Sequence, residues 1–127
     1  MATRILIAED DRAVREFIGR ALDHVGHEVA SVTDGLAALE ALRAAEYDLL
    51  ISDIMMPGLD GVSLALKVSK EWPDMGIMLM TGYAHERQRA HNLDSLSHEV
   101  ISKPFSLKEI TEAVQKALTV CGRSHTG

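Results

Sequence analysis

Acidic residues stand directly after two short apolar runs of this chain. Glu9, Asp10 and Asp11 follow the run RILIA, and Asp53 ends the stretch DLLISD. Neighbouring like charges repel one another, and a carboxylate at the end of a buried strand loses hydration. A cation would relieve both costs. Carboxylate oxygens without His or Cys favour a hard ion such as Mg²⁺ or Mn²⁺.

Two more polar residues follow apolar runs in the same way. Thr81 ends the stretch GIMLMT, and Lys103 follows EVIS. A Mg²⁺ site usually takes one or two carboxylates and leaves coordination positions for water or phosphate. Glu9, Asp10 and Asp53 together with Lys103 carry a local charge of −2, which one divalent ion would neutralise. A pocket of these residues could therefore accept a dianionic phosphoryl group.

These residues can act together only if the apolar runs are neighbouring strands. RILIA, DLLISD, GIMLMTG and EVISKP are near-continuously apolar, as in strands buried on both faces, and HEVASV is a weaker fifth run. Helical patterns lie between them over about 11–25, 35–45 and 61–71, and from a capping box at Ser106 and Glu109 to about 118. The alternation predicts an α/β fold with a doubly wound, five-stranded parallel sheet.

The helical patterns also predict which side chains face the sheet. Gly26 and Pro73 are expected to end the first and third helices. The polar segment 84–97 predicts only a short, frayed or shifted helix. The expected inward residues are Val14, Phe17, Ile18, Ala21, Leu22 and Val25 in the first helix, and Leu107, Ile110, Val114, Ala117 and Leu118 in the last.

In doubly wound sheets, ligands bind at the carboxyl ends of the strands, near the point where the strand order reverses. For the flavodoxin-like order 2-1-3-4-5, the first and third strands are neighbours at that point. Glu9, Asp10 and Asp53 are then expected to converge, with Thr81 and Lys103 on the flanking strands.

Composition excludes several classes of protein. The chain has 127 residues, a formal net charge of −6 and a pI of about 5.4, which argues against direct nucleic-acid binding. Its apolar runs are too short for membrane insertion. Cys121 is the only cysteine, so no internal disulfide can form and a cytoplasmic setting is expected.

At these positions the chain resembles the receiver domain of two-component response regulators, which has a CheY-like fold. The resemblance covers about residues 4–118 and rests on EDD, SDIMMPGLDG, MTGYA and SKPF, each ending its own predicted strand. It implies a single receiver domain over 1–127, with a core of about 4–120 and a short C-terminal tail. IMLMTGYA and ISKPFSL look like CpdR-type single-domain receivers of alphaproteobacterial phosphorelays, and also like receivers attached to hybrid kinases.

The resemblance implies a metal site made by four residues of this sequence. Asp53 matches the phosphoacceptor, which is also a metal ligand, and Asp10 matches the direct metal-ligand acid. Glu9 matches the acid that usually reaches the metal through water. Met55 stands where the family supplies a backbone carbonyl to the metal.

The remaining matched residues would handle the phosphoryl group. Thr81 matches the hydroxyl that bonds a phosphoryl oxygen, and Lys103 matches the lysine that pairs with the group. Pro104 matches a proline that follows a cis peptide bond in the family. The family's aromatic switch residue on the fifth strand corresponds to Val100 here, which puts the usual switch in doubt. Tyr83 is the nearest aromatic that could replace it.

The implied function is a signalling switch rather than an enzyme. Asp53 would take a phosphoryl group from the phosphohistidine of a sensor histidine kinase or a histidine phosphotransfer protein, with Mg²⁺ or Mn²⁺ bound. The chain would catalyse only its own phosphorylation and slow dephosphorylation. Its changed surface, formed by segment 84–97, the fifth strand and the last helix, would bind a downstream effector protein.

Other readings remain open at this point. The chain could be a receiver domain excised from a hybrid histidine kinase. A Mg²⁺-dependent aspartyl phosphatase of the haloacid-dehalogenase type needs a second acid two residues after the nucleophile, where this chain has Met55. A nucleotide- or flavin-binding module needs a Gly-rich or Ser/Thr-rich loop after the first strand, where this chain has acids.

Overall fold

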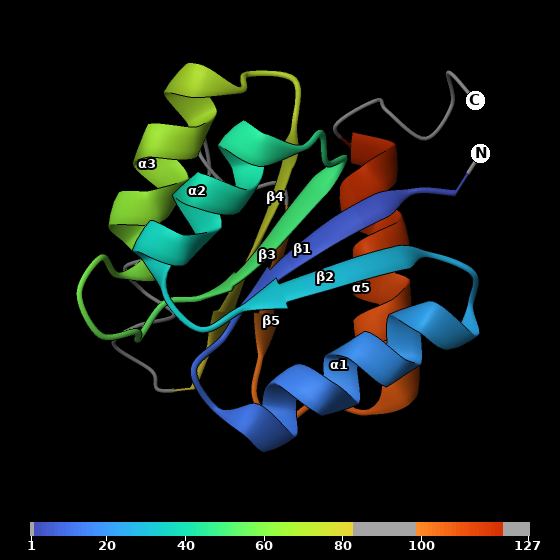
Figure 1. Cartoon of the computed structure of the whole chain (residues 1–127). Coiled ribbons are helices and arrows are strands. Elements are labelled where there is room, and N and C mark those ends of the chain that lie inside the picture. Colours follow the sequence, from blue (N-terminus) through green and yellow to red (C-terminus); the bar gives the residue numbers. More distant parts are fainter. Residues whose placement is uncertain (1, 83–98, 121–127) are drawn as a thin grey trace.

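The computed structural model describes residues 2–82 and 99–120, and it confirms the predicted strands and the predicted helices that lie in these ranges (Figure 1). The predicted helix over 84–97 lies outside the described residues, and so do Tyr83 and Cys121. The strands are β1 (Arg4–Ala8), β2 (Glu28–Val32), β3 (Leu49–Asp53), β4 (Gly76–Thr81) and β5 (Glu99–Ser102). The helices are α1 (Arg12–His24), α2 (Gly35–Ala44), α3 (Gly61–Glu71) and α5 (Leu107–Val120).

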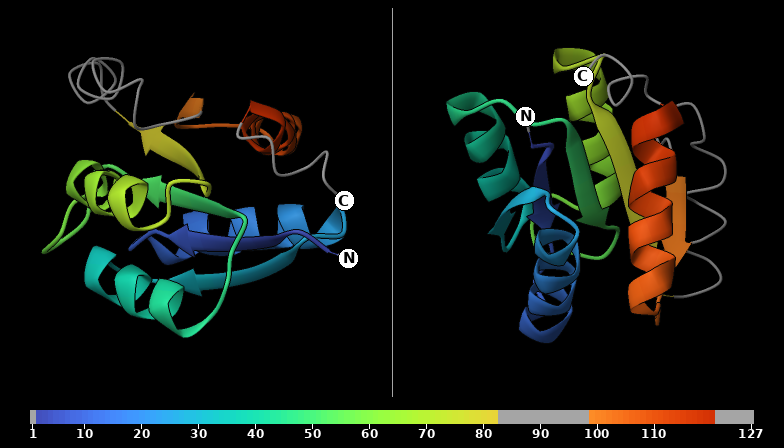
Figure 2. Two further views of the ribbon diagram at one scale, coloured as in Figure 1. Left: turned by 90° about the horizontal axis from the view of Figure 1, so that it is seen from above. Right: turned by 90° about the vertical axis from the view of Figure 1, so that its right-hand side faces the viewer.

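The sheet has the predicted order, β2-β1-β3-β4-β5, with every pair parallel. Helices α2 and α3 cover one face of the sheet, and α1 and α5 cover the other (Figures 1 and 2). All five carboxyl ends lie at one edge, where Asp53 is level with Met80 and Thr81 is level with Ser102. Within 2–82 and 99–120, no helix is both long and apolar enough to cross a membrane.

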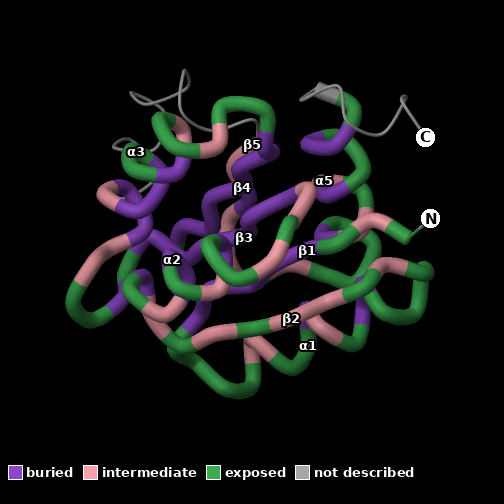
Figure 3. Tube along the Cα trace, turned by 45° about the horizontal axis from the view of Figure 1, so that its top comes forward, coloured by how far each residue is buried: buried purple, intermediate pink, exposed green. Residues whose placement is uncertain are grey.

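The core consists of two apolar layers, one on each face of the sheet. In β1, Leu6 packs into the layer under α2 and α3, whereas Ile5 and Ile7 pack into the layer under α1 and α5. This division explains the near-continuous apolar runs, because each inner strand needs apolar side chains on both faces. The edge strand β2 is only partly buried, in agreement with its weaker apolar pattern (Figure 3).

Three side chains that the helical pattern placed inward are largely exposed. Phe17 is 40% exposed, Val25 50% and Leu107 49%. Val25 is the C-cap of α1 and Leu107 is the first residue of α5, so both lie at helix ends. Phe17 borders the buried stripe of α1, and its ring lies 6.2 Å from that of Phe105. Periodicity alone was a wrong guide at these boundary positions.

The helices begin at the edge of the sheet where the strands have their carboxyl ends, and side chains cap their N-termini. Asp11, Asp34 and Asp60 each accept hydrogen bonds from backbone N–H groups in the first turn of α1, α2 and α3. Ser106 and Glu109 form the predicted capping box of α5, at 2.8 and 3.1 Å. Such caps stabilise a helix by about 1 kcal/mol each and hold the loops of this edge in place.

Gly61 is required by close packing rather than by backbone conformation. Its φ is not positive, but an added Cβ would lie 2.2 Å from the carbonyl oxygen of Asp53 and 2.8 Å from Cα of Ile54. Its N–H donates to the carbonyl oxygen of Ile54 at 2.9 Å. The start of α3 therefore packs directly on the backbone that follows β3.

Replacing Gly61 by alanine is expected to destabilise the protein, because the new methyl group overlaps backbone atoms that cannot move freely. The free energy of unfolding, measured by urea denaturation followed by circular dichroism, should fall by about 1–3 kcal/mol. Gly19→Ala is the matched control, since Gly19 lies inside α1 with open space around it. That change should instead raise the free energy by about 0.5–1 kcal/mol. Equal effects of the two changes would contradict this account.

Candidate functional site

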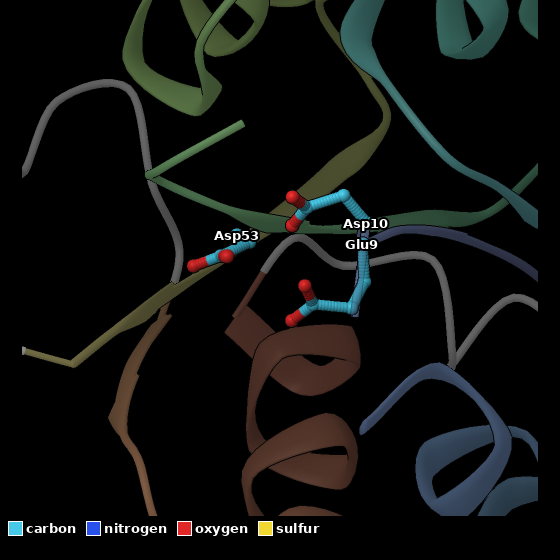
Figure 4. A group of neighbouring side chains, drawn as sticks. All are labelled: Glu9, Asp10 and Asp53. Carbon is cyan, nitrogen blue, oxygen red and sulfur yellow. The ribbon is translucent and has the colours of Figure 1, made fainter. Parts of the chain in front are cut away.

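The three acids predicted to converge do so at the ends of β1 and β3. One carboxylate oxygen from each of Glu9, Asp10 and Asp53 lies within 4.8 Å of the others (Figure 4). Glu9 and Asp53 are buried, and Asp10 is exposed at the mouth of the site. Three negative oxygens this close repel strongly in a partly buried site. An all-carboxylate donor set of this kind fits Mg²⁺ or Mn²⁺.

Lys103 reaches this group from the end of β5. Its Nζ lies 2.8 Å from Oε1 of Glu9 and 3.2 Å from Oδ2 of Asp53. Its backbone N–H donates to the carbonyl oxygen of Thr81 at 2.8 Å, and the peptide bond before Pro104 is cis, as the resemblance implied. One ammonium thus contacts two of the three carboxylates.

Burial and charge act on the two partners in different ways. Burial raises the pKa of Glu9 and the nearby charge of Asp53 adds to this effect, which outweighs the hydrogen bonds from Lys103 and from the Asp11 N–H. Burial acts to lower the pKa of Lys103, but its hydrogen bond to Glu9 and the charge of Asp53 outweigh it and raise the pKa. The pocket therefore favours the charged form of Lys103, whereas burial keeps the pKa of Glu9 raised.

Two contacts to Glu9 lie outside what the sequence predicted. The backbone N–H of Asp11 donates to Oε2 of Glu9 at 2.9 Å, and Nη1 of Arg15 donates to the Glu9 carbonyl oxygen at 2.8 Å. The Arg15 contact spans six residues across the turn from β1 into α1. No helical or strand periodicity encodes that spacing, so the sequence carried no signal for it.

The other predicted site residues lie at the same edge of the sheet. Thr81 ends β4 next to Asp53 and is 1% exposed. Met55 follows Asp53 by two residues, and this residue is 54% exposed. The side chain thus points away from the protein interior, which is compatible with a role for the Met55 backbone carbonyl. Val100 is partly buried against the apolar layer under α2 and α3.

A cavity of about 690 Å³ lies at the opposite edge of the sheet and includes none of these residues. Residues 42–47 and 71–75, at the ends of α2 and α3 and in the loops that follow, line it. The chemistry-bearing side chains are gathered at the other edge. We therefore place the functional site at the acidic group, on the basis of its charge and hydrogen bonding.

Comparison with known proteins gives concordant matches over most of the chain. The family model of the response regulator receiver domain matches residues 5–115. The response regulator receiver protein CpdR of Brucella abortus is 36% identical over 115 residues, which cover 91% of this chain and 96% of that protein. The response regulator MprA of Mycobacterium ulcerans is 35% identical over 93% of this chain, which spans only 51% of MprA.

Solved structures agree with these sequence matches. The response regulator TrrA of Thermotoga maritima, in complex with Mg²⁺–BeF, is 33% identical and superposes with a TM-score of 0.82, over 91% of this chain and 98% of TrrA. NtrX of Brucella abortus has a TM-score of 0.89 over 99% of this chain and 29% of NtrX, but at 24% identity it supports the fold alone. The chain thus belongs to the response regulator receiver domain family of two-component systems.

Proposed function

We propose that this chain is a phosphoacceptor switch of a two-component system or phosphorelay, with Asp53 as the residue that is phosphorylated. The observation that carries the proposal is the convergence of Glu9, Asp10 and Asp53 within 4.8 Å, with Lys103 bonded to two of them. The donor would be the phosphohistidine of a sensor histidine kinase or a histidine phosphotransfer protein. The family match and the likeness to CpdR support this assignment.

In the proposed reaction, a carboxylate oxygen of Asp53 attacks the phosphorus of phosphohistidine. The new O–P bond forms as the P–N bond breaks, and the imidazole of the partner leaves. The ammonium of Lys103 lies 3.2 Å from Oδ2 of Asp53, so it would be close enough to form an ion pair with an oxygen of the transferred phosphoryl group. The hydroxyl of Thr81, at the end of the neighbouring strand, would bond a second phosphoryl oxygen.

The acids fit a Mg²⁺ or Mn²⁺ site with divided roles. Asp10 and Asp53 would bind the ion directly, Glu9 would reach it through water, and Met55 would supply its backbone carbonyl. When bound, the ion would neutralise charge on the carboxylates and on the incoming phosphoryl oxygens. Both carboxylate oxygens of Glu9 already accept hydrogen bonds, Oε1 from Lys103 at 2.8 Å and Oε2 from the Asp11 N–H at 2.9 Å, which suits Glu9 to the indirect role.

Phosphorylation would add about one negative charge and new acceptor oxygens at Asp53. We propose that this change alters a surface that binds a downstream effector protein, and that residues 1–127 act as one receiver domain in the cytoplasm. A receiver attached to a hybrid histidine kinase would use the same site. A phosphatase role lacks support, because Met55 stands where a second acid is needed.

Substituting Asp53→Asn is expected to abolish phosphorylation, since an amide oxygen is a far weaker nucleophile than a carboxylate. The protein would be incubated with acetyl phosphate and Mg²⁺, and intact mass spectrometry would detect the added phosphoryl group. Asp34→Asn is the matched control, because Asn also caps a helix and Asp34 caps α2 and is not one of the three clustered acids. The control should be phosphorylated like the wild type. Equal labelling of Asp53→Asn would contradict the assignment.

Magnesium is expected to stabilise the wild-type protein by about 2.7 kcal/mol when its concentration is one hundred times the dissociation constant. Asp10→Asn should lose most of this gain. The same variant should be more stable than the wild type without Mg²⁺, because one of three repelling charges is gone. Thermal unfolding with Mg²⁺ or EDTA measures both effects.

Asp11→Asn is the control for the magnesium measurement, since Asp11 is adjacent in sequence but caps α1. It should keep the full response to Mg²⁺. A loss of the response in Asp11→Asn with retention in Asp10→Asn would overturn the proposed ligand set.

A further inference from the structure

Ser102, the last residue of β5, contains a buried polar atom that the proposed chemistry does not use. Its Oγ is shielded from solvent, and it has no hydrogen-bond partner in the described part of the chain. A buried hydroxyl without a partner is unfavourable, and such groups are rare in folded proteins. Alanine would fit the same place without that cost. The unsatisfied hydroxyl therefore suggests a partner that is bonded in another state of the protein.

The sheet register identifies the candidate partner. Ser102 is paired with Thr81 across β4 and β5, and the bond from the Lys103 N–H to the Thr81 carbonyl holds the two strand ends in this register. Residues paired on neighbouring strands project their side chains from the same face, about 4.8 Å apart. A rotation about Cα–Cβ can bring two hydroxyls at this spacing into hydrogen-bond contact.

Thr81 also stands between Ser102 and the phosphoacceptor. The strand order β3-β4-β5 places Asp53, Thr81 and Ser102 on successive strands. Asp53 is level with Met80, so Thr81 lies one residue further along, about 3.3 Å beyond it. A group attached to the Asp53 carboxylate at the end of β3 would project toward that level. The three residues thus end three successive strands at this edge of the sheet.

We propose that Ser102 is a positioning residue, which donates a hydrogen bond to Oγ1 of Thr81 while Thr81 donates to a phosphoryl oxygen on Asp53. This inference rests on the proposed function. No proton is transferred, because each hydroxyl hydrogen stays covalently bonded to its own oxygen while it forms a hydrogen bond to the next acceptor. Hydrogen bonds in such a chain polarise and strengthen one another. Ser102 favours the phosphorylated state because its hydroxyl is unsatisfied in the structure described above.

The two residues before Ser102 in β5 have apolar side chains, so neither could form the proposed hydrogen bond. Val100 lies two residues earlier on the same face and carries no polar group, although it stands where the family has an aromatic switch residue. Ile101 packs into the opposite layer of the core. Ser102 is the only residue of β5 with a hydroxyl, and it is the residue of β5 paired with Thr81.

The test is a double-mutant cycle on the full chain, with Mg²⁺ and beryllofluoride as the phosphoryl analogue. Affinity for the analogue would be measured by amide NMR titration of the wild type, Ser102→Ala, Thr81→Ala and the double variant. Ser102→Ala should weaken binding roughly fivefold to tenfold, the effect of one hydrogen bond. The Ser102→Ala change should have no effect on affinity in the Thr81→Ala background, because the hydroxyl that would link Ser102 to the phosphoryl analogue is then missing.

A second measurement separates positioning from a general structural role. Without the analogue, Ser102→Ala should raise the urea midpoint of unfolding, since it removes an unsatisfied hydroxyl. Ser102→Thr keeps the hydroxyl and should retain analogue affinity near that of the wild type. Ser31→Ala, on the exposed edge strand β2, is the matched serine control and should change neither quantity.

The outcomes distinguish this inference from the function on which it rests. If the wild-type protein does not respond to Mg²⁺ and beryllofluoride, the proposed phosphoacceptor function is wrong. If the wild type binds the analogue but Ser102→Ala binds equally well, Ser102 has no positioning role. An equal loss of affinity in the presence and absence of the Thr81 hydroxyl would also overturn the inference, because the effect would then not pass through Thr81.

Discussion

The repulsion among three carboxylates at one edge of the sheet is the physical constraint on which the site depends. One carboxylate oxygen from each of Glu9, Asp10 and Asp53 lies within 4.8 Å of the others, and the ammonium of Lys103 contacts Glu9 and Asp53. The raised pKa of Glu9 shows that burial and like charge are not fully compensated. Binding of a divalent cation would remove this unfavourable electrostatic free energy, and the cation-loaded pocket could then accept a dianionic group.

The surrounding fold keeps the carboxylates from moving apart. Apolar layers on both faces bury β1 and β3 side by side, so their ends cannot separate without exposing the core. The start of α3 packs on the backbone at Asp53 through Gly61, and the side chain of Asp11 caps α1 while its N–H holds Glu9. The stability of the core thus maintains an electrostatic arrangement that would be unfavourable by itself.

The edge of the sheet also explains how a local change at Asp53 could be transmitted. Thr81 and Ser102 end the two strands that follow β3 in the sheet, so polar residues continue along this edge from Asp53, the proposed phosphoacceptor. Val100 offers only apolar packing at the position where the family places an aromatic ring. Strand β5 carries no aromatic ring, so the coupling that we propose along this strand is hydrogen bonding between hydroxyls.

Much of the fold and the identity of the candidate site residues followed from the sequence. Apolar runs of strand length, helical periodicity and caps such as Ser106 with Glu109 are local signals, and they predicted the elements. The strand order was expected from the flavodoxin-like fold that the resemblance implied, and the sheet has it. The position of Asp53, Thr81 and Lys103 after such runs indicated which side chains share the carboxyl edge. The same periodicity was wrong for Phe17 and Leu107, because burial at the borders of a helix depends on what packs there.

Other features were decided by the tertiary structure alone. The bond between Lys103 and Glu9 joins residues 94 positions apart, and the contact of Arg15 with the Glu9 carbonyl crosses an irregular turn. The close approach of Gly61 to Asp53 and the unsatisfied hydroxyl of Ser102 are also invisible in the order of residues. The reason is physical: periodicity and burial are encoded within each element, whereas distances between side chains of different elements depend on strand register, loop path and packing together.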